Sequence, residues 1–244
     1  MAAAGLLLRF LTVCLAFSLH ATAWGSDLRD VTKRGYAAAE AGQFAKALTF
    51  FEEAAQKGEP VAQFNLASIL SHGEGVWADK KRAFFWYEKA ANAGVPQAMH
   101  NVAVFLDEGQ FVPINKPLAA VWYRRAAELG VPKSQTNLAL MLFNGEGISK
   151  DPGEALKWFR LAAEAGEPSA QQSMGAVLSR SNDPVDRIQS LIWFIILSKH
   201  EPASIEWVDR IAKTMTATQV QTARAEASAW QPRKTNFPEG LISP

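Results

Sequence analysis

The sequence predicts an all-α fold: a solenoid of about five stacked helix hairpins, with capping helices at its C-terminal end. The main observation is a phrase typified by AANAGVPQAMHN, which recurs every 36 residues, beginning at Ala54, Ala90, Ala126 and Ala162. Each copy contains a helix stop and a helix start, and apolar residues recur at helical spacing between the copies. Because a hairpin with a single apolar face cannot bury that face alone, repeated hairpins are expected to stack.

The phrase itself is interpreted as a tight connection between two helices. A glycine follows each Ala-rich run, and glycine adopts the left-handed conformation that ends a helix without a Cβ penalty. A proline stands two residues later, where its fixed φ suits the first helical position. The residues concerned are Gly58, Gly94, Gly130 and Gly166, followed by Pro60, Pro96, Pro132 and Pro168.

The first helix of each hairpin carries an aromatic pair one turn after an alanine, a large-and-small pattern that lets neighbouring helices interdigitate. Trp86, Trp122 and Trp158 are therefore predicted to pack in the core rather than to form a ladder for stacking sugars. The second helices share Asn65, Asn101 and Asn137, which we expect to hydrogen-bond backbone across repeats. The aromatic pairs are Phe50-Phe51, Trp86-Tyr87, Trp122-Tyr123 and Trp158-Phe159.

Between hairpins lie the loops HGEGV, EGQFV and NGEGI, each followed by a helix N-cap residue, Asp79, Asn115 or Asp151. The run from Asp151 to Glu154 is typical of a capping box with proline at the first helical position. The loops carry Glu74 and Glu146, which would repel an anion, so we interpret them as turns and not as phosphate-binding loops.

This arrangement resembles the Sel1-like repeat family, relatives of tetratricopeptide repeats with a Gly-x-Gly loop. The resemblance covers roughly residues 28–200, and residues 215–230 are similar to the closing helix of exported bacterial members. It departs from the family at Leu70, Leu106 and Leu142, where tyrosine is usual, and at Phe111, where the second glycine is expected. The resemblance implies a right-handed α-solenoid that binds other proteins, and no particular reaction.

The predicted boundaries follow the repeats. Residues 1–23 are expected to form a signal peptide, residues 24–231 the repeat domain and residues 232–244 a flexible tail. The predicted units are 28–60, 61–96, 97–132, 133–168 and 169–203, with a cap at 204–231. Helices are expected at about 204–214 and 217–230.

The N-terminal segment has the features of an export signal. Phe10–Leu19 is a short apolar run after Arg9, and Ala21-Thr22-Ala23 is a cleavage pattern. We therefore expect a periplasmic or secreted protein that begins at Trp24, and a mitochondrial presequence is the alternative. Removing residues 1–23 takes away the single cysteine and leaves 24 basic and 24 acidic residues. Such a balance predicts no nucleic-acid partner.

Catalytic and metal-binding patterns are weak in this sequence. His72, His100 and His200 do not stand in metal-ligand spacing, although His72 and His100 could approach each other beside Glu74 and Glu108. No nucleophile motif or isolated carboxylate pair occurs. We therefore predict no catalytic residue, no metal and no cofactor.

Recognition residues are sought where the copies differ, since shared positions hold the architecture. In the second helices these positions fall at i, i+4 and i+8, which we expect to form a stripe on the concave wall. Phe64, Val104 and Leu140 are the expected apolar anchors. The predicted partner-binding residues are Phe64, Ser68, His72, His100, Val104, Glu108, Thr136, Leu140 and Asn144, with Gln172, Ala176 and Arg180 on the same stripe.

The predicted function is a non-enzymatic adaptor in the cell envelope that binds a partner polypeptide on this face. A hydrolase of the repeat family, directed at cell-wall material or antibiotics, and a mitochondrial or secretory repeat adaptor are the alternatives. The apolar segment Leu191–Leu197 has two interpretations, a helix buried beneath the C-terminal helices or an exposed partner surface.

Overall fold

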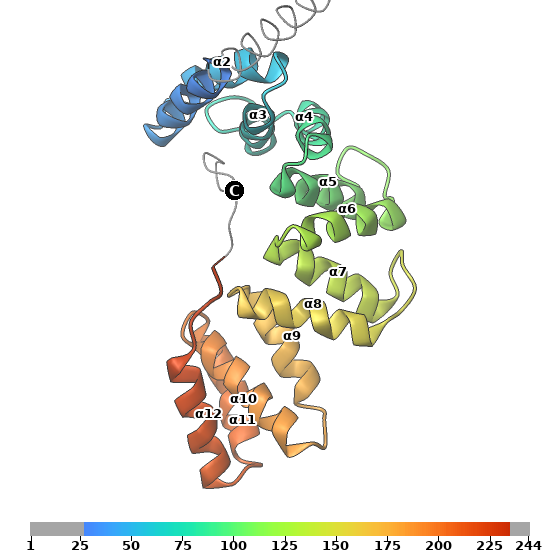
Figure 1. Ribbon diagram of the computed structural model, residues 1–244, viewed down its shortest axis with the longest axis vertical. Helices are drawn as coiled ribbons and strands as arrows, with labels where there is room; N and C mark the ends of the chain where they lie inside the picture. The colour runs from blue at the N-terminus through green and yellow to red at the C-terminus, as the bar shows by residue number, and fades with distance from the viewer. Residues whose placement is uncertain (1–26, 235–244) are drawn as a thin grey trace, which may run out of the picture. The chain divides into compact units, whose positions relative to one another are not determined.

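The computed structural model describes residues 27–234, in which all the regular secondary structure is helical and no β-strand occurs. They fall into two compact units, an N-terminal unit (27–98) and a C-terminal unit (99–234), which are described separately. Residues 27–40 are helical, and the chain continues through helices that pack on their neighbours in sequence within each unit (Figure 1). These are α2 (Phe44–Gln56), α3 (Pro60–His72), α4 (Lys80–Asn92), α5 (Pro96–Glu108), α6 (Lys116–Glu128), α7 (Pro132–Asn144), α8 (Pro152–Glu164), α9 (Pro168–Leu178), α10 (Pro184–Ser198), the 3-10 helix η1 (Pro202–Ser204), α11 (Ile205–Ala212) and α12 (Ala217–Ala229).

The predicted helix connections are confirmed. The four repeated glycines have φ angles of 91°, 94°, 86° and 92°, in the left-handed region that costs other residues free energy. Each proline that follows is the first residue of the next helix, so α3, α5, α7 and α9 all begin on proline. The same backbone turn therefore joins both helices of every hairpin.

The predicted N-caps are also confirmed, whereas the capping box is not. The side chains of Asp79, Asn115 and Asp151 each accept a hydrogen bond from the backbone N–H three residues later. Glu154, however, does not reach back to Asp151. Its carboxylate pairs with Arg124 at 2.5 Å and accepts a hydrogen bond from Trp158 Nε1 at 3.0 Å, so the neighbouring helix α6 competes for it.

The prediction that the tryptophans of the aromatic pairs lie in the core is wrong. Trp86, Trp122 and Trp158 are partly exposed, and the second aromatic residue of each pair, Tyr87, Tyr123 or Phe159, is buried to 2% exposure or less. Successive residues on an α-helix point about 100° apart, and in each pair it is the second side chain that faces the core. The alanines one turn earlier are fully buried, as expected: Ala83, Ala119 and Ala155.

The Gly-x-Gly loops need their second glycine for two reasons. Gly147 has a φ of 69°, and a Cβ there would lie 2.6 Å from the backbone of Lys116 at the start of α6. Gly75 has a φ of 67°, and a Cβ there would lie 2.7 Å from the side chain of Phe44 at the start of α2. Phe111 occupies the equivalent position in the intervening loop and keeps the left-handed conformation, with a φ of 62° and a side chain that is 72% exposed.

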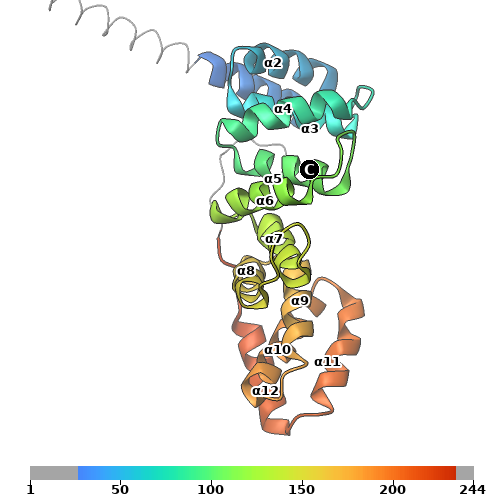
Figure 2. The same cartoon turned by 90° about the vertical axis from the view of Figure 1, so that its right-hand side faces the viewer.

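The C-terminal helices cover α10 and confirm that Leu191–Leu197 is buried. Leu191, Phe194 and Ile196 have no exposed surface. The ring of Phe194 stacks on Trp207 of α11 at 5.4 Å, and Trp193 meets the ring of Trp230 edge-on at 6.3 Å. Figure 2 shows α10 with α11 and α12 beside it. The predicted helices at 204–214 and 217–230 correspond to α11 and α12.

The expected signal peptide, residues 1–23, and most of the expected tail lie outside the described residues. Arg233, at the start of that tail, donates its backbone N–H to the Glu164 carbonyl at 2.7 Å and pairs with the Glu164 carboxylate. Across residues 27–234, no helix combines the length and the apolar character that crossing a membrane requires.

Candidate functional site

The second helices of the C-terminal unit share one solvent-facing line, which we call the exposed face. On α7 it contains Lys133, Asn137, Leu140 and Asn144, spaced by four, three and four residues. This alternation averages 3.67 residues, close to the 3.6-residue helical turn, and so keeps all four side chains on one side of the helix. The same positions, 36 residues away, are at least partly exposed on α5, on α9 and in the turn after α9: Asn101, Val104, Glu108, Ser173, Ala176 and Arg180.

The predicted stripe coincides with this face at only some positions. Leu140 is 41% exposed, Glu108 and Asn144 are exposed, and Val104 is partly exposed. Thr136 is 2% exposed, and its hydroxyl donates to the Pro132 carbonyl at 3.1 Å. A spacing of eight residues turns about 80° beyond two full turns, so the two ends of the predicted stripe point in different directions.

In the N-terminal unit the predicted stripe is mostly buried. Phe64 and Ser68 are each 1% exposed, and the Phe64 ring packs against Tyr87 at 5.7 Å. His72, at the end of α3, is exposed, and its Nδ1 lies 2.9 Å from the Ser68 carbonyl. Phe64 is thus part of the core, and of the three expected apolar anchors only Val104 and Leu140 reach the surface.

His100 lies at the border of the exposed face and contacts three helices. It projects from α5, its Nδ1 is 2.8 Å from the Ser134 hydroxyl of α7, and its ring lies 5.7 Å from that of Tyr123 on α6. Burial, with a smaller contribution from the charge of Lys133, lowers the His100 pKa from 6.5 to about 4. The imidazole is therefore neutral near pH 7.

The pairing of His100 with Ser134 has the residue types of a nucleophile and its base. Ser134, however, has no exposed surface, so its hydroxyl cannot meet a substrate in this arrangement. Within residues 27–234, no three His, Cys, Asp or Glu side chains gather in a way that could hold a metal ion. The contact between His100 and Ser134 instead joins α5 to α7 beneath the exposed face.

Asn137, one of the repeated asparagines, does not act as predicted. The Asn137 side chain hydrogen-bonds the phenol of Tyr123, a side chain of α6, rather than backbone across repeats. Burial raises the pKa of Tyr123, and the phenol stays protonated. Asn137 therefore belongs both to the exposed face and to the support beneath it.

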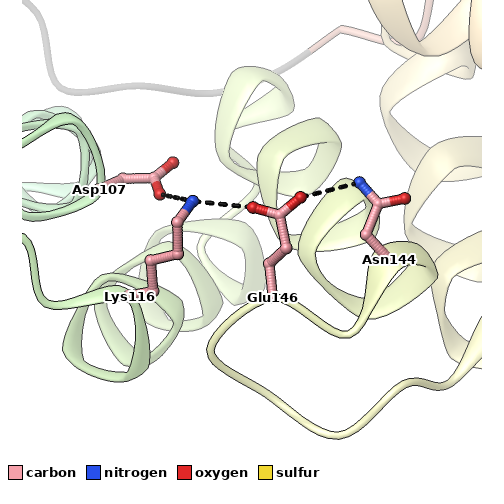
Figure 3. A network of polar contacts seen from close by, with 4 residues as sticks. All are labelled: Asp107, Lys116, Asn144 and Glu146. Atoms are coloured by element: carbon pink, nitrogen blue, oxygen red, sulfur yellow. Dashed lines mark hydrogen bonds and ion pairs between the residues drawn. The ribbon is translucent and has the colours of Figure 1, made fainter.

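A polar network fixes the C-terminal end of the exposed face (Figure 3). Lys116 Nζ lies 3.0 Å from Asp107 Oδ1 and 2.8 Å from Glu146 Oε2, and Asn144 donates to Glu146 Oε1 at 3.2 Å. Hydrogen bonds from Lys116 and then Asn144 lower the pKa of Glu146. Glu146, expected only to repel anions, thus ties the loop after α7 to α5 and α6.

A further repeated contact was not anticipated from the sequence. The side-chain amides of Gln63, Gln135 and Gln171 donate to the carbonyls of Ala55, Ala127 and Ala163, at 3.2, 3.0 and 3.3 Å. These carbonyls lie near the end of the preceding helix, where backbone acceptors lack helical partners. The sequence did contain a sign of this contact, because glutamine recurs at this position in three copies and Met99 replaces it in the fourth.

Comparison with known proteins gives the family. The Sel1 repeat model matches residues 38–59, 60–95, 96–131 and 132–167, which together make up more than half of the chain. No curated protein matches the chain in sequence.

Two solved structures are similar over most of the chain. One is c5321, a protective antigen of uropathogenic Escherichia coli with an SLR fold, at 29% identity and a TM-score of 0.69 over 77% of this chain. The match spans 41% of that antigen's length. The other is a Sel1 repeat protein from Oxalobacter formigenes, at 25% identity and a TM-score of 0.66, covering 82% of this chain and 87% of that one. The predicted fold class, a right-handed α-solenoid of helix hairpins, is confirmed, and the chain belongs to the Sel1 repeat family.

Proposed function

We propose that this protein is a non-enzymatic adaptor of the cell envelope that binds a partner polypeptide on the exposed face of α5, α7 and α9. Sel1 repeats mediate protein–protein interaction, and their scaffold is generally non-catalytic. The envelope setting rests on the export signal expected at residues 1–23. A mature N-terminus at Trp24, read by sequencing the purified native protein, is the expected result for that part of the proposal.

The observation that carries the proposal is the contrast between buried and exposed positions at the same repeat interval. One buried row keeps one character: Ala103, Ala139 and Gly175 are all small. The adjacent exposed positions differ from copy to copy: Val104, Leu140 and Ala176 in one row, and Glu108, Asn144 and Arg180 in the next. Each copy thus presents different chemistry from the same scaffold, as recognition of a particular partner requires.

Leu140 is the expected anchor of this interaction. It is an apolar side chain 41% exposed between the polar Asn137 and Asn144, and α7 is held from beneath by the contacts of Ser134 and Asn137. A rigid apolar residue surrounded by polar groups is the usual organisation of an interface centre.

The test is cross-linked affinity capture from the native envelope fraction with wild-type protein and the Leu140→Glu variant. Leu129→Glu is the matched control, because Leu129 is 51% exposed but belongs to the end of α6 and not to the exposed face. Wild type and Leu129→Glu should capture the same partner, and Leu140→Glu should weaken its binding at least tenfold, about 1.4 kcal/mol. Equal capture by all three folded proteins would contradict the proposed site.

A further inference from the structure

The N-terminal unit contains a cavity that the adaptor proposal does not use. Its volume is about 520 Å³, within the range of small-ligand sites. One wall comes from the helix at residues 27–40 and the other from the start of α3. The lining residues are Arg29, Thr32, Lys33, Tyr36, Glu59, Pro60 and Val61.

The helix that forms the first wall can be aligned with the helices of the exposed face through a glycine that packs against an aromatic ring. Gly35 packs against Phe51, where a Cβ would lie 2.7 Å from the ring, as Gly175 of α9 packs against Phe194 at 2.6 Å. Arg29, Lys33 and Tyr36 stand at the same offsets from Gly35 as Ser169, Ser173 and Ala176 do from Gly175. The cavity therefore uses helix positions that are at least partly exposed on α5, α7 and α9, and here two of them are cationic.

The electrostatic balance of the cavity favours an anion. Among the described residues, Glu59 is the only acidic one that lines the cavity. Its carboxylate accepts hydrogen bonds from the backbone N–H of Ala62 at 2.5 Å and from the Thr32 hydroxyl at 3.0 Å. Because Glu59 caps the N-terminus of α3, the helix dipole offsets its charge. The two cations of the opposite wall are not offset in this way.

Both cations remain available to a ligand. Arg29 forms no ion pair with any residue between 27 and 234. Lys33 lies 3.7 Å from Asp30, but both side chains are more than two-thirds exposed, and such pairs contribute little. The phenol of Tyr36 hydrogen-bonds Glu40, which leaves its ring to line the cavity.

The remaining lining groups are apolar and define what accompanies the anion. Pro60, Val61 and the Tyr36 ring lie in the same cavity as Arg29 and Lys33. At the start of α3, Pro60 has no N–H, and the N–H groups of Ala62 and Gln63 donate to the carboxylate and the carbonyl of Glu59. A phosphate would therefore find few of the donors that usually hold it at a helix N-terminus. A carboxylate needs only the two cations.

We propose that this cavity binds an acidic side chain of a partner polypeptide, with an adjacent apolar side chain against Pro60 and Val61. The site is separate from the exposed face, and it rests on the proposed function only in taking a polypeptide as its ligand. Arg29 and Lys33 supply the charge recognition, and Val61 with the Tyr36 ring supplies apolar contact.

The experiment is selection from a random peptide library displayed on phage, against the immobilised full-length protein. Wild type is compared with Arg29→Glu/Lys33→Glu, after circular dichroism and denaturant unfolding show equal folding. Lys46→Glu is the control, because Lys46 is an exposed cation of α2 outside the cavity. Wild type and Lys46→Glu should enrich peptides with Asp or Glu beside an apolar residue, and the double variant should lose that enrichment at least tenfold.

The most enriched peptide is then synthesised with its acidic residue kept or replaced by the amide, and binding is measured by calorimetry. The amide form should bind at least tenfold more weakly to wild type. Selection without acidic enrichment, or the same enrichment with the double variant, would overturn the proposal. If Leu140→Glu abolishes peptide binding and Arg29→Glu/Lys33→Glu does not, the peptide binds the exposed face, so the adaptor proposal stands and the cavity proposal fails.

Discussion

The hairpins α6–α7 and α8–α9 and the cap α10–α12 bury their apolar surface in different ways. In the hairpins, each first helix buries a narrow face made of alanines and one aromatic ring, such as Ala119 with Tyr123. In the cap, α10 buries six apolar side chains between Leu191 and Leu197 on several sides. The difference shows that a repeat can rely on its neighbour, whereas the last helix of an array must be enclosed by elements that are not repeats.

The largest expected effect on stability comes from removing an aromatic ring of the cap, and it tests the difference between the two regions. Phe194→Ala should lower the free energy of unfolding by about 3–5 kcal/mol, because Phe194 is fully buried between Gly175 and Trp207. Trp122→Ala is the control in the hairpins and should cost less than half as much, since Trp122 is partly exposed and packs beneath Arg125. Denaturant unfolding followed by circular dichroism measures both, and equal losses would show that the two regions are alike.

Acidification should act on the hairpins through His100. Its folded pKa of about 4 lies below the unfolded value of 6.5, so the unfolded chain binds the proton more readily between these values. The contribution of His100 to stability is complete above about pH 6.5 and is lost as the pH falls towards 4, by at most about 3 kcal/mol. Between pH 7 and 4, the free energy of unfolding should fall less for His100→Gln than for wild type. An equal fall in the two proteins would contradict the assignment.

The smallest expected effect concerns the loop between α5 and α6. Phe111 keeps a left-handed conformation that the equivalent Gly75 and Gly147 adopt without strain. Phe111→Gly should therefore raise the free energy of unfolding by about 0.5–1 kcal/mol. The reverse change, Gly147→Ala, should lower it, because its Cβ would meet Lys116. Thermal unfolding of the two variants gives the comparison, and a loss of stability in Phe111→Gly would mean that the exposed ring has a contact of its own.

Much of the fold could be predicted from the sequence because its determinants are local. The connection at Gly130 and Pro132 depends on the φ preferences of two residues, and the N-cap of Asp151 depends on a backbone N–H three residues away. Neither required knowledge of which helices pack together. The burial of Leu191–Leu197 was one of two interpretations, because it depends on whether the helices that follow cover α10.

The candidate site was predicted less well, since small angular errors accumulate along a helix. Placing Thr136 on the same stripe as Asn144 ignored a rotation of about 80°, which is the difference between core and solvent. The same oversight placed Trp122 in the core, whereas the structure buries its neighbour Tyr123 and leaves Trp122 partly exposed. The contact of His100 with Ser134 spans 34 residues and depends on how α5 packs against α7, for which the sequence has no local signal.

The uniform connection within each hairpin has a consequence for how such a chain can change in length. Since Pro132 and Pro168 begin equivalent helices after the same left-handed glycine, residues 133–168 form a cassette whose two ends are interchangeable. Duplicating that cassette adds one copy of the exposed face and creates no new type of junction. Copy number can therefore vary in the interior of the array, while α10 and its covering helices must remain at the end.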